Sequence, residues 1–309
     1  MTNYSKSARI YGQTGFKAFC KRNAGIIFIL LWLIGFLVFR LYPFLSSLFY
    51  SFTDYNLFKD PHYSQTGLMN YEMIFNNRQI LTAFGVTFKY AFITVPLKLV
   101  FALFVAYILN YKIKGVNLFR TAYYIPSILG GSVAIAVLWK ALFSDDGVIN
   151  VLLSVFGIQG PTWLSDPNLA VFIISLLRVW QFGSAMVLFL AALKGVSLDL
   201  YEAATIDGAS KARQFFNITL PLITPIVFYN LVTQIVQAFQ EFNGPYIITK
   251  GGPRSATTLI SLLIYNRAFK SFEMGISSAM AWGLFVIVAV LSIIAFVSQK
   301  KWVYYDDQS

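Results

Sequence analysis

A row of amide and carboxylate side chains interrupts a strongly apolar part of the sequence. Its members are spaced by four, three and four residues between Asn230 and Glu241, so an α-helix would carry them on one face. Polar groups within a membrane segment usually face the protein interior or a cavity, and amides and carboxylates suit the hydroxyl groups of a sugar. Amides that only join neighbouring helices are the alternative. The candidate substrate-binding residues are Asn230, Gln234, Gln237, Gln240, Glu241 and Asn243.

A second, weaker set lies upstream, where Arg178, Gln181 and Ser184 recur at every third residue. Charges inside apolar runs are costly, so such residues should face protein or water, or extend to the membrane surface. The carboxylate of Glu241 argues against an anionic sugar at that point, and the guanidinium of Arg178 argues for one. The sequence therefore leaves the charge of the solute open. Other basic residues in or beside apolar runs are Arg40, Lys89, Lys98 and Lys140.

A polar connector over residues 197–217 predicts two short helices joined by a turn. Ser197 or Asp199 can cap the first helix, which contains the helix-forming Glu-Ala-Ala sequence at 202–204. Gly208 suits the left-handed conformation in which many helices end. The small side chains suit the cleft of a partner protein, and the glutamate can pair with an arginine there. An amphipathic connector without a partner is the alternative.

The composition places these residues in a membrane protein. Of 309 residues, 57% are hydrophobic and 12% are charged, which is about half the charged share of a soluble domain. Each apolar run is long enough to supply the ~20 residues that cross a bilayer core. The sequence therefore predicts an all-α polytopic membrane protein with six transmembrane helices, approximately over residues 24–49, 80–109, 121–143, 168–193, 222–242 and 275–297.

The flanks of these spans predict the organisation and orientation of the chain. Residues 1–23 form a basic tail, either disordered or an interfacial helix, residues 24–298 form the membrane domain, and residues 299–309 form a second tail. The first span is a retained helix and not a signal peptide, because its apolar run continues through Arg40 and Pro43 without a small-residue cleavage site. Basic residues favour the side of the two tails, so both termini are predicted to be cytoplasmic.

Several functions are disfavoured by composition. The net charge of +11 comes largely from basic residues beside apolar spans, a pattern that does not indicate nucleic-acid binding. The single cysteine, Cys20, excludes a disulfide within the chain. The single histidine, His62, argues against a metal or catalytic site built from several histidines. The sequence contains no Gly-x-x-x-x-Gly-Lys-Ser/Thr motif, so no cofactor is predicted in this chain and ATP would have to be bound elsewhere.

The connector resembles the EAA loop of ABC importer permeases. Glu-Ala-Ala at 202–204 is followed by Asp-Gly-Ala at 207–209 and by Leu220-Pro221 with the family's spacing. Tyr-Ile-Pro-Ser at 124–127 and Gly-Gly-Pro at 251–253 are similar to further motifs of carbohydrate permeases. Together these motifs resemble those of the maltose-type and glycerol-phosphate-type permease subunits of binding-protein-dependent carbohydrate importers. Residues before about 24 match this family least.

The resemblance implies the type I ABC importer permease fold in a prokaryotic cell membrane, with no catalysis of its own. The chain would pair with a second, related permease subunit, rest on two ATPase subunits that bind ATP and Mg²⁺, and receive a carbohydrate from an external binding protein. The connector would be the coupling helix in a groove of the ATPase. The residues carried over for ATPase coupling are Glu202, Ala203, Ala204, Asp207, Gly208 and Ala209.

Two other classes of membrane protein agree less well with the sequence. A secondary transporter driven by an ion gradient would need no ATPase partner, but such proteins often carry internal repeats, and none is evident here. A membrane enzyme would need paired carboxylates or Ser/His and Cys/His sets, and the predicted spans contain none. The secondary transporter stays the alternative, and a bound ATPase that depends on Glu202 would separate the two.

Overall fold

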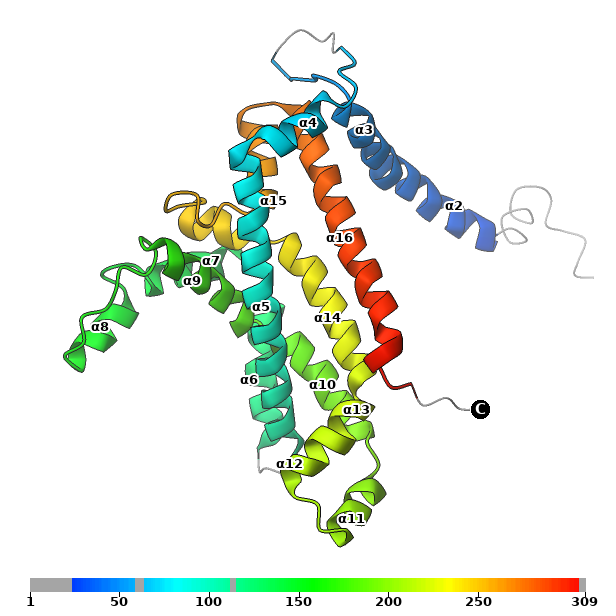
Figure 1. Cartoon of the computed structure of the whole chain (residues 1–309), viewed down its shortest axis with the longest axis vertical. Helices are drawn as coiled ribbons and strands as arrows, with labels where there is room; N and C mark the ends of the chain where they lie inside the picture. The colour runs from blue at the N-terminus through cyan, green and yellow to red at the C-terminus, as the bar shows by residue number, and fades with distance from the viewer. Residues whose placement is uncertain (1–23, 59–63, 112–114, 306–309) are drawn as a thin grey trace, which may run out of the picture.

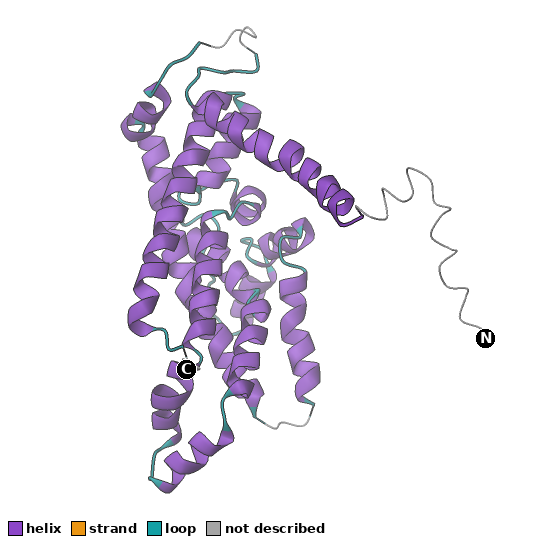
Figure 2. Cartoon of the chain, turned by 90° about the vertical axis from the view of Figure 1, so that its right-hand side faces the viewer, coloured by secondary structure: helices purple, strands orange, loops and turns teal. Residues whose placement is uncertain are grey.

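The computed structural model describes residues 24–58, 64–111 and 115–305. Within these ranges the chain is built from helices and loops, and its β contacts are two isolated bridges (Figure 2). The predicted basic tail, including its interfacial helix, lies outside the described residues. The molecule is elongated, with α4 (Met69–Asn76) near one end and α11 (Leu198–Ile206) at the other (Figure 1). We call these the α4 end and the α11 end.

Three helices are long and apolar enough to cross a membrane without a break. The first is a continuous run of α2 (Ala24–Phe36), the π-helical turn η1 (Leu37–Leu41) and α3 (Tyr42–Ser51), which leans away from the bundle (Figure 1). The other two are α5 (Arg78–Asn110) and α16 (Met274–Trp302). Helix α16 continues beyond the predicted end of the sixth span and includes Lys300 and Lys301 in its last turn. Positive side chains are favourable there, because they interact with the negative end of the helix dipole.

Three further crossings are pairs of helices that bend at a short break. The bends are 102° between α6 (Val116–Ile128) and α7 (Val133–Leu142), and 47° between α9 (Pro167–Trp180) and α10 (Gly183–Gly195). A third bend of 67° separates the segment Lys211–Leu222 from α14 (Thr224–Phe239). With each pair counted as one crossing, the prediction of an all-α protein with six spans is confirmed.

Bends interrupt the third, fourth and fifth predicted spans. Between α6 and α7 the chain passes through Gly130 and Gly131, and Gly131 has a φ of +83°, which glycine adopts far more easily than other residues. Before α14, Pro225 removes a backbone N–H from the first turn, which suits a helix start and not a helix interior. Hydropathy detects the apolar content of such segments but not these turns.

Shorter helices fill the connections between the spans. The connection between the first and second predicted spans contains α4, and the connection between the third and fourth contains α8 (Val148–Val155). The core forms along α5, which packs against α9, α10 and α14 and buries residues such as Tyr90. The remaining short elements are α12 (Lys211–Gln214), η2 (Phe215–Thr219), α13 (Leu220–Leu222), η3 (Pro245–Thr249), α15 (Ile260–Tyr265) and η4 (Asn266–Lys270).

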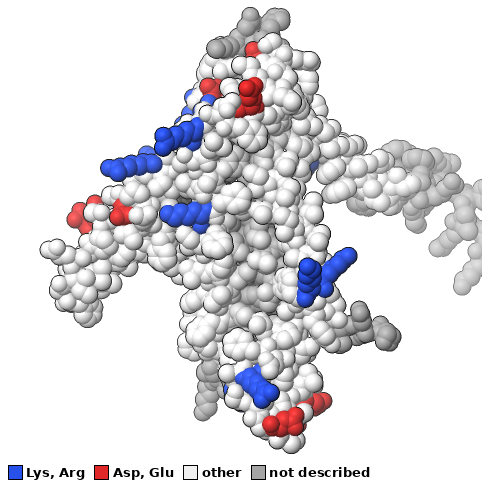
Figure 3. Space-filling model, viewed as in Figure 1, with Lys and Arg blue, Asp and Glu red and all other residues white. Residues whose placement is uncertain are grey.

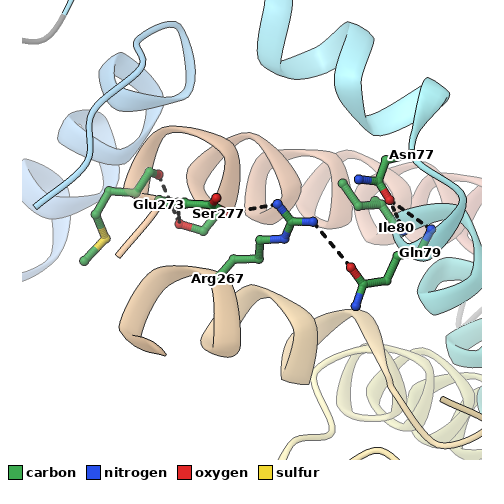
Figure 4. Close-up of polar contacts among 7 residues, drawn as sticks. Asn77, Gln79, Ile80, Arg267, Glu273 and Ser277 are labelled. Carbon is green, nitrogen blue, oxygen red and sulfur yellow. Dashed lines mark hydrogen bonds and ion pairs between the residues drawn. The ribbon is translucent and has the colours of Figure 1, made fainter. Parts of the chain in front are cut away.

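Arg267 joins three elements towards the α4 end (Figure 4). Its guanidinium donates to Glu273 Oε2 over 2.9 Å and to Gln79 Oε1 over 3.4 Å, so η4 is tied to the start of α16 and to the first turn of α5. Asn77 caps α5, since its Oδ1 accepts hydrogen bonds from the backbone N–H groups of Gln79 and Ile80. The α4 end is therefore held by side chains from segments far apart in the sequence.

Gly183 is expected to tolerate no side chain, because α10 touches α6 there. A Cβ at Gly183 would lie 2.4 Å from the carbonyl oxygen of Tyr123 and 2.8 Å from Cα of Tyr124. Gly183→Ala should lower the free energy of unfolding by about 1–3 kcal/mol, measured on the purified protein. Gly195→Ala, in the last residue of the same helix, has nothing within 4 Å of the new Cβ and serves as the control. Equal effects of the two substitutions would contradict this close packing.

Candidate functional site

Two of the helix breaks, α6–α7 and α9–α10, come together with the chain that follows α14, and hydrogen bonds join the three segments. Ser127, at the end of α6, accepts a hydrogen bond from the backbone N–H of Ser184 at 3.0 Å and donates one to the carbonyl of Gln181 at 3.1 Å. Asn243, which follows α14, donates to the carbonyl of Gly131 at 3.0 Å. Backbone groups released from the helices are thus satisfied by neighbouring breaks, as a membrane interior requires.

A buried ion pair lies at this meeting point. Arg178 Nε on α9 is 2.7 Å from Glu241 Oε2, and the side chains are 23% and 8% exposed. Arg178 Nη1 also donates to Gln181 Oε1 at 3.1 Å, and Glu241 Oε1 accepts from the backbone N–H of Gly244 at 3.0 Å. Both carboxylate oxygens are therefore bound, and the guanidinium spans the break between α9 and α10.

A cavity of about 160 Å³ opens beside the ion pair. Ligand pockets usually hold ~300–1,000 Å³, so this cavity fits only part of a larger ligand. Hydrogen-bond donors and acceptors line the cavity, together with the apolar side chains of Ala136, Leu177 and Phe242. Its polar side chains are Ser132, Arg178, Gln181, Gln240, Glu241 and Asn243.

The structure divides the six predicted substrate-binding residues into two groups. Gln240, Glu241 and Asn243 line the cavity, whereas the other three lie on α14 away from its lining. Asn230 is buried and donates to the carbonyl of Ile226 at 3.1 Å, one turn earlier in the same helix. Gln234 is also buried, and Gln237 is exposed.

The predicted single helical face is wrong at its final member. Helix α14 ends at Phe239, so Glu241 belongs to the following segment and not to the face of Asn230. The chain is not helical at Glu241 and Phe242, and it then continues towards η3, whose first residue is Pro245. Glu241 reaches the cavity because the chain turns, and periodicity cannot anticipate such a turn.

Sequence reasoning ranked Arg178 and Gln181 below the α14 row, and the structure places both in the cavity lining. Ser132 and Lys98 received no role. Lys98 is 3% exposed on α5, the helix that packs against α9. A lysine within an apolar run was the available signal for this position. Among the described residues, no three His, Cys, Asp or Glu side chains gather as a metal-binding group.

The polar connector forms the two predicted helices and the turn between them. Ser197 Oγ accepts from the backbone N–H of Asp199 at the start of α11. Gly208, with a φ of +75°, follows the helix, and the N–H of Ala209 donates to the carbonyl of Ala204 at 2.8 Å. This closes the helix as a left-handed glycine cap does.

Gln214 joins α12 to the turn and was not singled out from the sequence. It is 3% exposed, and its Nε2 donates to Thr205 Oγ1 at 2.9 Å and to the carbonyl of Ala209 at 3.2 Å. Nearby, the hydroxyls of Tyr201 and Thr219 are 2.8 Å apart. These bonds fix the angle between the two short helices. The local sequence is polar, and nothing in it indicates that this glutamine is buried.

The outer surface of α11 is both acidic and apolar. Negative side chains gather at the α11 end, where Asp199, Glu202 and Asp207 are exposed (Figure 3). Ile206 is 87% exposed, although apolar side chains of this size are usually buried. Among the residues carried over for coupling, Ala203 and Gly208 are exposed, and Ala204 and Ala209 are partly buried.

Comparison with known proteins identifies the family. Residues 66–302 match the family model of the binding-protein-dependent transport system inner membrane component. A probable ABC transporter permease protein of Bacillus subtilis, YesP, is 47% identical over 92% of this chain and 93% of its own length. The AmyD permease protein of a probable starch degradation products transport system in Thermoanaerobacterium thermosulfurigenes is 31% identical over 89% of this chain and 94% of its own length.

The fold has a counterpart among solved structures. A chain of a bacterial alginate ABC transporter, solved in complex with an alginate pentasaccharide-bound periplasmic protein, superposes with a TM-score of 0.77. The match covers 92% of this chain and 96% of the other at 23% sequence identity, and it supports the type I permease fold. The protein therefore belongs to the binding-protein-dependent transport system inner membrane components, the multi-pass membrane permease subunits of ABC importers, and is not itself an enzyme.

Proposed function

We propose that this chain forms half of the translocation path of a carbohydrate importer. The meeting of two helix breaks and the chain after α14 at a polar cavity carries this proposal, because transporters build solute sites from discontinuous helices whose free backbone groups line a cavity. The names of relatives, which include starch degradation products and trehalose/maltose systems, support a sugar as the solute. Gln181, Gln240 and Asn243 would bind its hydroxyl groups.

The partners follow from what this chain lacks. A cavity of about 160 Å³ is too small for an oligosaccharide, so a second, related permease subunit would complete the path. The sequence has no phosphate-binding loop, so two ATPase subunits would bind ATP and Mg²⁺. An external binding protein would deliver the carbohydrate. The α11 end, with the coupling residues 202–209, would face the cytoplasm and the ATPase subunits, as would both termini.

In this proposal α11 transmits movement from the ATPase subunits to the membrane helices. Its exposed Ile206 and small side chains would enter a groove on an ATPase subunit, with Glu202 beside a basic residue of that subunit. Gln214 and the bonded pair Tyr201–Thr219 make the connector a stiff unit. Movement of the ATPase subunits would therefore be transmitted to α13 and α14, and from there to the cavity segment that follows α14.

Gln240→Ala tests the cavity as a solute site. Loss of one hydrogen bond of about 1 kcal/mol should raise the KM of uptake roughly fivefold while ATPase assembly is unchanged. The assay uses the complete transporter in lipid vesicles with the labelled carbohydrate that its own binding protein retains. Gln159→Ala, at an exposed position outside the cavity lining, is the control. An unchanged KM would move the site elsewhere, and uptake without any ATPase subunit would favour the secondary transporter.

A further inference from the structure

A group of aromatic side chains begins at the cavity and extends towards the α4 end. Phe242 lines the cavity, and its ring centroid is 5.0 Å from that of Tyr265 on α15. The ring centroid of Tyr265 is 5.3 Å from that of Phe269 on η4, the element that Arg267 ties to the starts of α5 and α16. We call Phe242, Tyr265 and Phe269 the aromatic strip. The strip joins the cavity to the part of the molecule that lies opposite α11.

Contacts between two segments hold the aromatic strip in place. The hydroxyl of Ser261, in the first turn of α15, donates a hydrogen bond to the backbone carbonyl of Glu241, the residue before Phe242. Tyr246 packs against two members of the strip: its ring centroid is 5.0 Å from that of Phe242 and 5.3 Å from that of Tyr265. Aromatic rings at such distances attract one another beyond the effect of burial. The rings therefore form one connected surface.

The aromatic strip is accessible and has a polar group at its border. Phe242 and Tyr265 are partly exposed, and Phe269 is 59% exposed. Lys270 is exposed as well, and its Nζ lies 5.6 Å from the centroid of the Tyr246 ring. The ring attracts a cation at this distance, and the ammonium group still has N–H donors to offer. The surface thus combines aromatic rings with hydrogen-bonding groups.

Aromatic rings bordered by hydrogen-bonding groups suit sugars. The C–H groups on one face of a pyranose ring carry a partial positive charge, so they are attracted to the negative face of an aromatic ring. The hydroxyl groups at the edge of the sugar can accept hydrogen bonds from an ammonium group. The centroid distances of 5.0 and 5.3 Å are close to the spacing of successive rings in an extended oligosaccharide. A lipid tail would gain nothing from Lys270 or from the polar cavity at the other end of the strip.

We propose that the aromatic strip is an outer subsite, which binds the sugar rings of the carbohydrate that do not fit into the cavity. One sugar ring occupies the cavity of about 160 Å³, and the following rings lie on Tyr265 and Phe269. Phe242 belongs to both surfaces, so the saccharide passes from one to the other without a gap. This inference rests on the proposed carbohydrate function and specifies saccharides of two or more rings as the substrate class.

Tyr265→Leu tests the subsite, because it removes a ring and keeps an apolar side chain at a partly buried position. Binding is measured on the complete transporter in nanodiscs, without the external binding protein. The probes form two series: glucose, maltose and maltotriose, and galactose with its β-1,4-linked dimer and trimer. The wild-type transporter should bind the trisaccharide of one series about tenfold more tightly than its monosaccharide. Tyr265→Leu should lower this ratio roughly fivefold and leave binding of the monosaccharide unchanged.

Three further variants separate the rings from other causes. Tyr265→Phe keeps the ring and should keep the ratio. Phe269→Leu changes the exposed end of the aromatic strip, where little packing is lost, and should also lower the ratio. Phe75→Leu removes an exposed ring on α4, outside the strip, and should leave the ratio unchanged.

Three results would overturn the inference: equal binding of the monosaccharide and the trisaccharide, a ratio that Tyr265→Leu and Phe269→Leu do not change, or an equal loss with Phe75→Leu. If Phe269→Leu instead releases the second permease subunit at an unchanged ratio, the strip is a subunit interface and not a subsite. ATP-driven uptake of a saccharide alongside any of these results would refute the subsite alone and leave the importer function standing. If no saccharide binds and none is taken up with ATP, the carbohydrate function fails together with this inference.

Discussion

Replacing Gly208 by valine is expected to lower ATP-driven uptake at least about tenfold and to release the ATPase subunits. Gly208 has a φ of +75°, and a side chain in this left-handed conformation costs about 1–2 kcal/mol. Each 1.4 kcal/mol is a factor of about ten in an equilibrium. The strain would be relieved by reorienting α11, which carries Glu202 and the exposed Ile206. The measurement is co-purification of the ATPase subunits, followed by uptake in vesicles.

The chain contains a closely matched control for this substitution. Gly157 has a φ of +74°, and as at Gly208, a new Cβ would meet no atom within 4 Å. It also follows a short helix, with the N–H of Ile158 bonded to the carbonyl of Leu153. Gly157→Val should therefore impose the same backbone cost far from α11 and leave ATPase binding intact. If both variants lose the ATPase equally, or neither does, the coupling role of the turn is refuted.

Glu241→Gln is expected to destabilise the protein by about 3 kcal/mol. Removing one partner of a buried ion pair typically costs 3–5 kcal/mol, because the remaining charge is left uncompensated. Here the loss leaves Arg178 without its anion, and the partial exposure of Arg178 places the effect at the lower end of this range. The free energy of unfolding of the purified permease is the measurement, and loss of uptake should accompany the change.

Two further variants show whether charge is the cause. Glu273→Gln breaks the ion pair with Arg267, whose side chains are 22% and 40% exposed, and should cost less than about 1 kcal/mol. Adding Arg178→Met to Glu241→Gln should recover part of the lost stability, because the cation left unpaired is removed. A double variant as unstable as Glu241→Gln alone would mean that lost packing or the lost Gly244 contact is responsible.

Much of the architecture was predictable because it depends on local properties of the chain. The length of each apolar run determines whether a helix can cross a bilayer, and the six crossings follow from this. The two helices of the connector follow from Ser197, the Glu-Ala-Ala sequence and Gly208, each of which acts on neighbouring backbone groups. The spacing of these residues also allowed the family to be recognised.

The site was predictable only in part. The sequence identified Gln240, Glu241 and Asn243 as polar residues in an apolar region, and these line the cavity. It also placed Asn230 with them, because regular helical spacing was extrapolated beyond Phe239, where the helix ends. The burial of Gln214 could not be predicted from the polar sequence of the connector. Its partners Thr205 and Ala209 come close to it only when the connector folds back.

The sequence by itself determined that this is a helical membrane permease with an exposed connector, because hydropathy and helix ends are encoded in consecutive residues. The tertiary structure alone decided which polar groups meet. Arg178 and Glu241 are far apart in the chain and lie 2.7 Å apart only because the end of α9 meets the segment that follows α14. Charge balance in a membrane interior depends on such convergence between distant segments, and no local pattern records it.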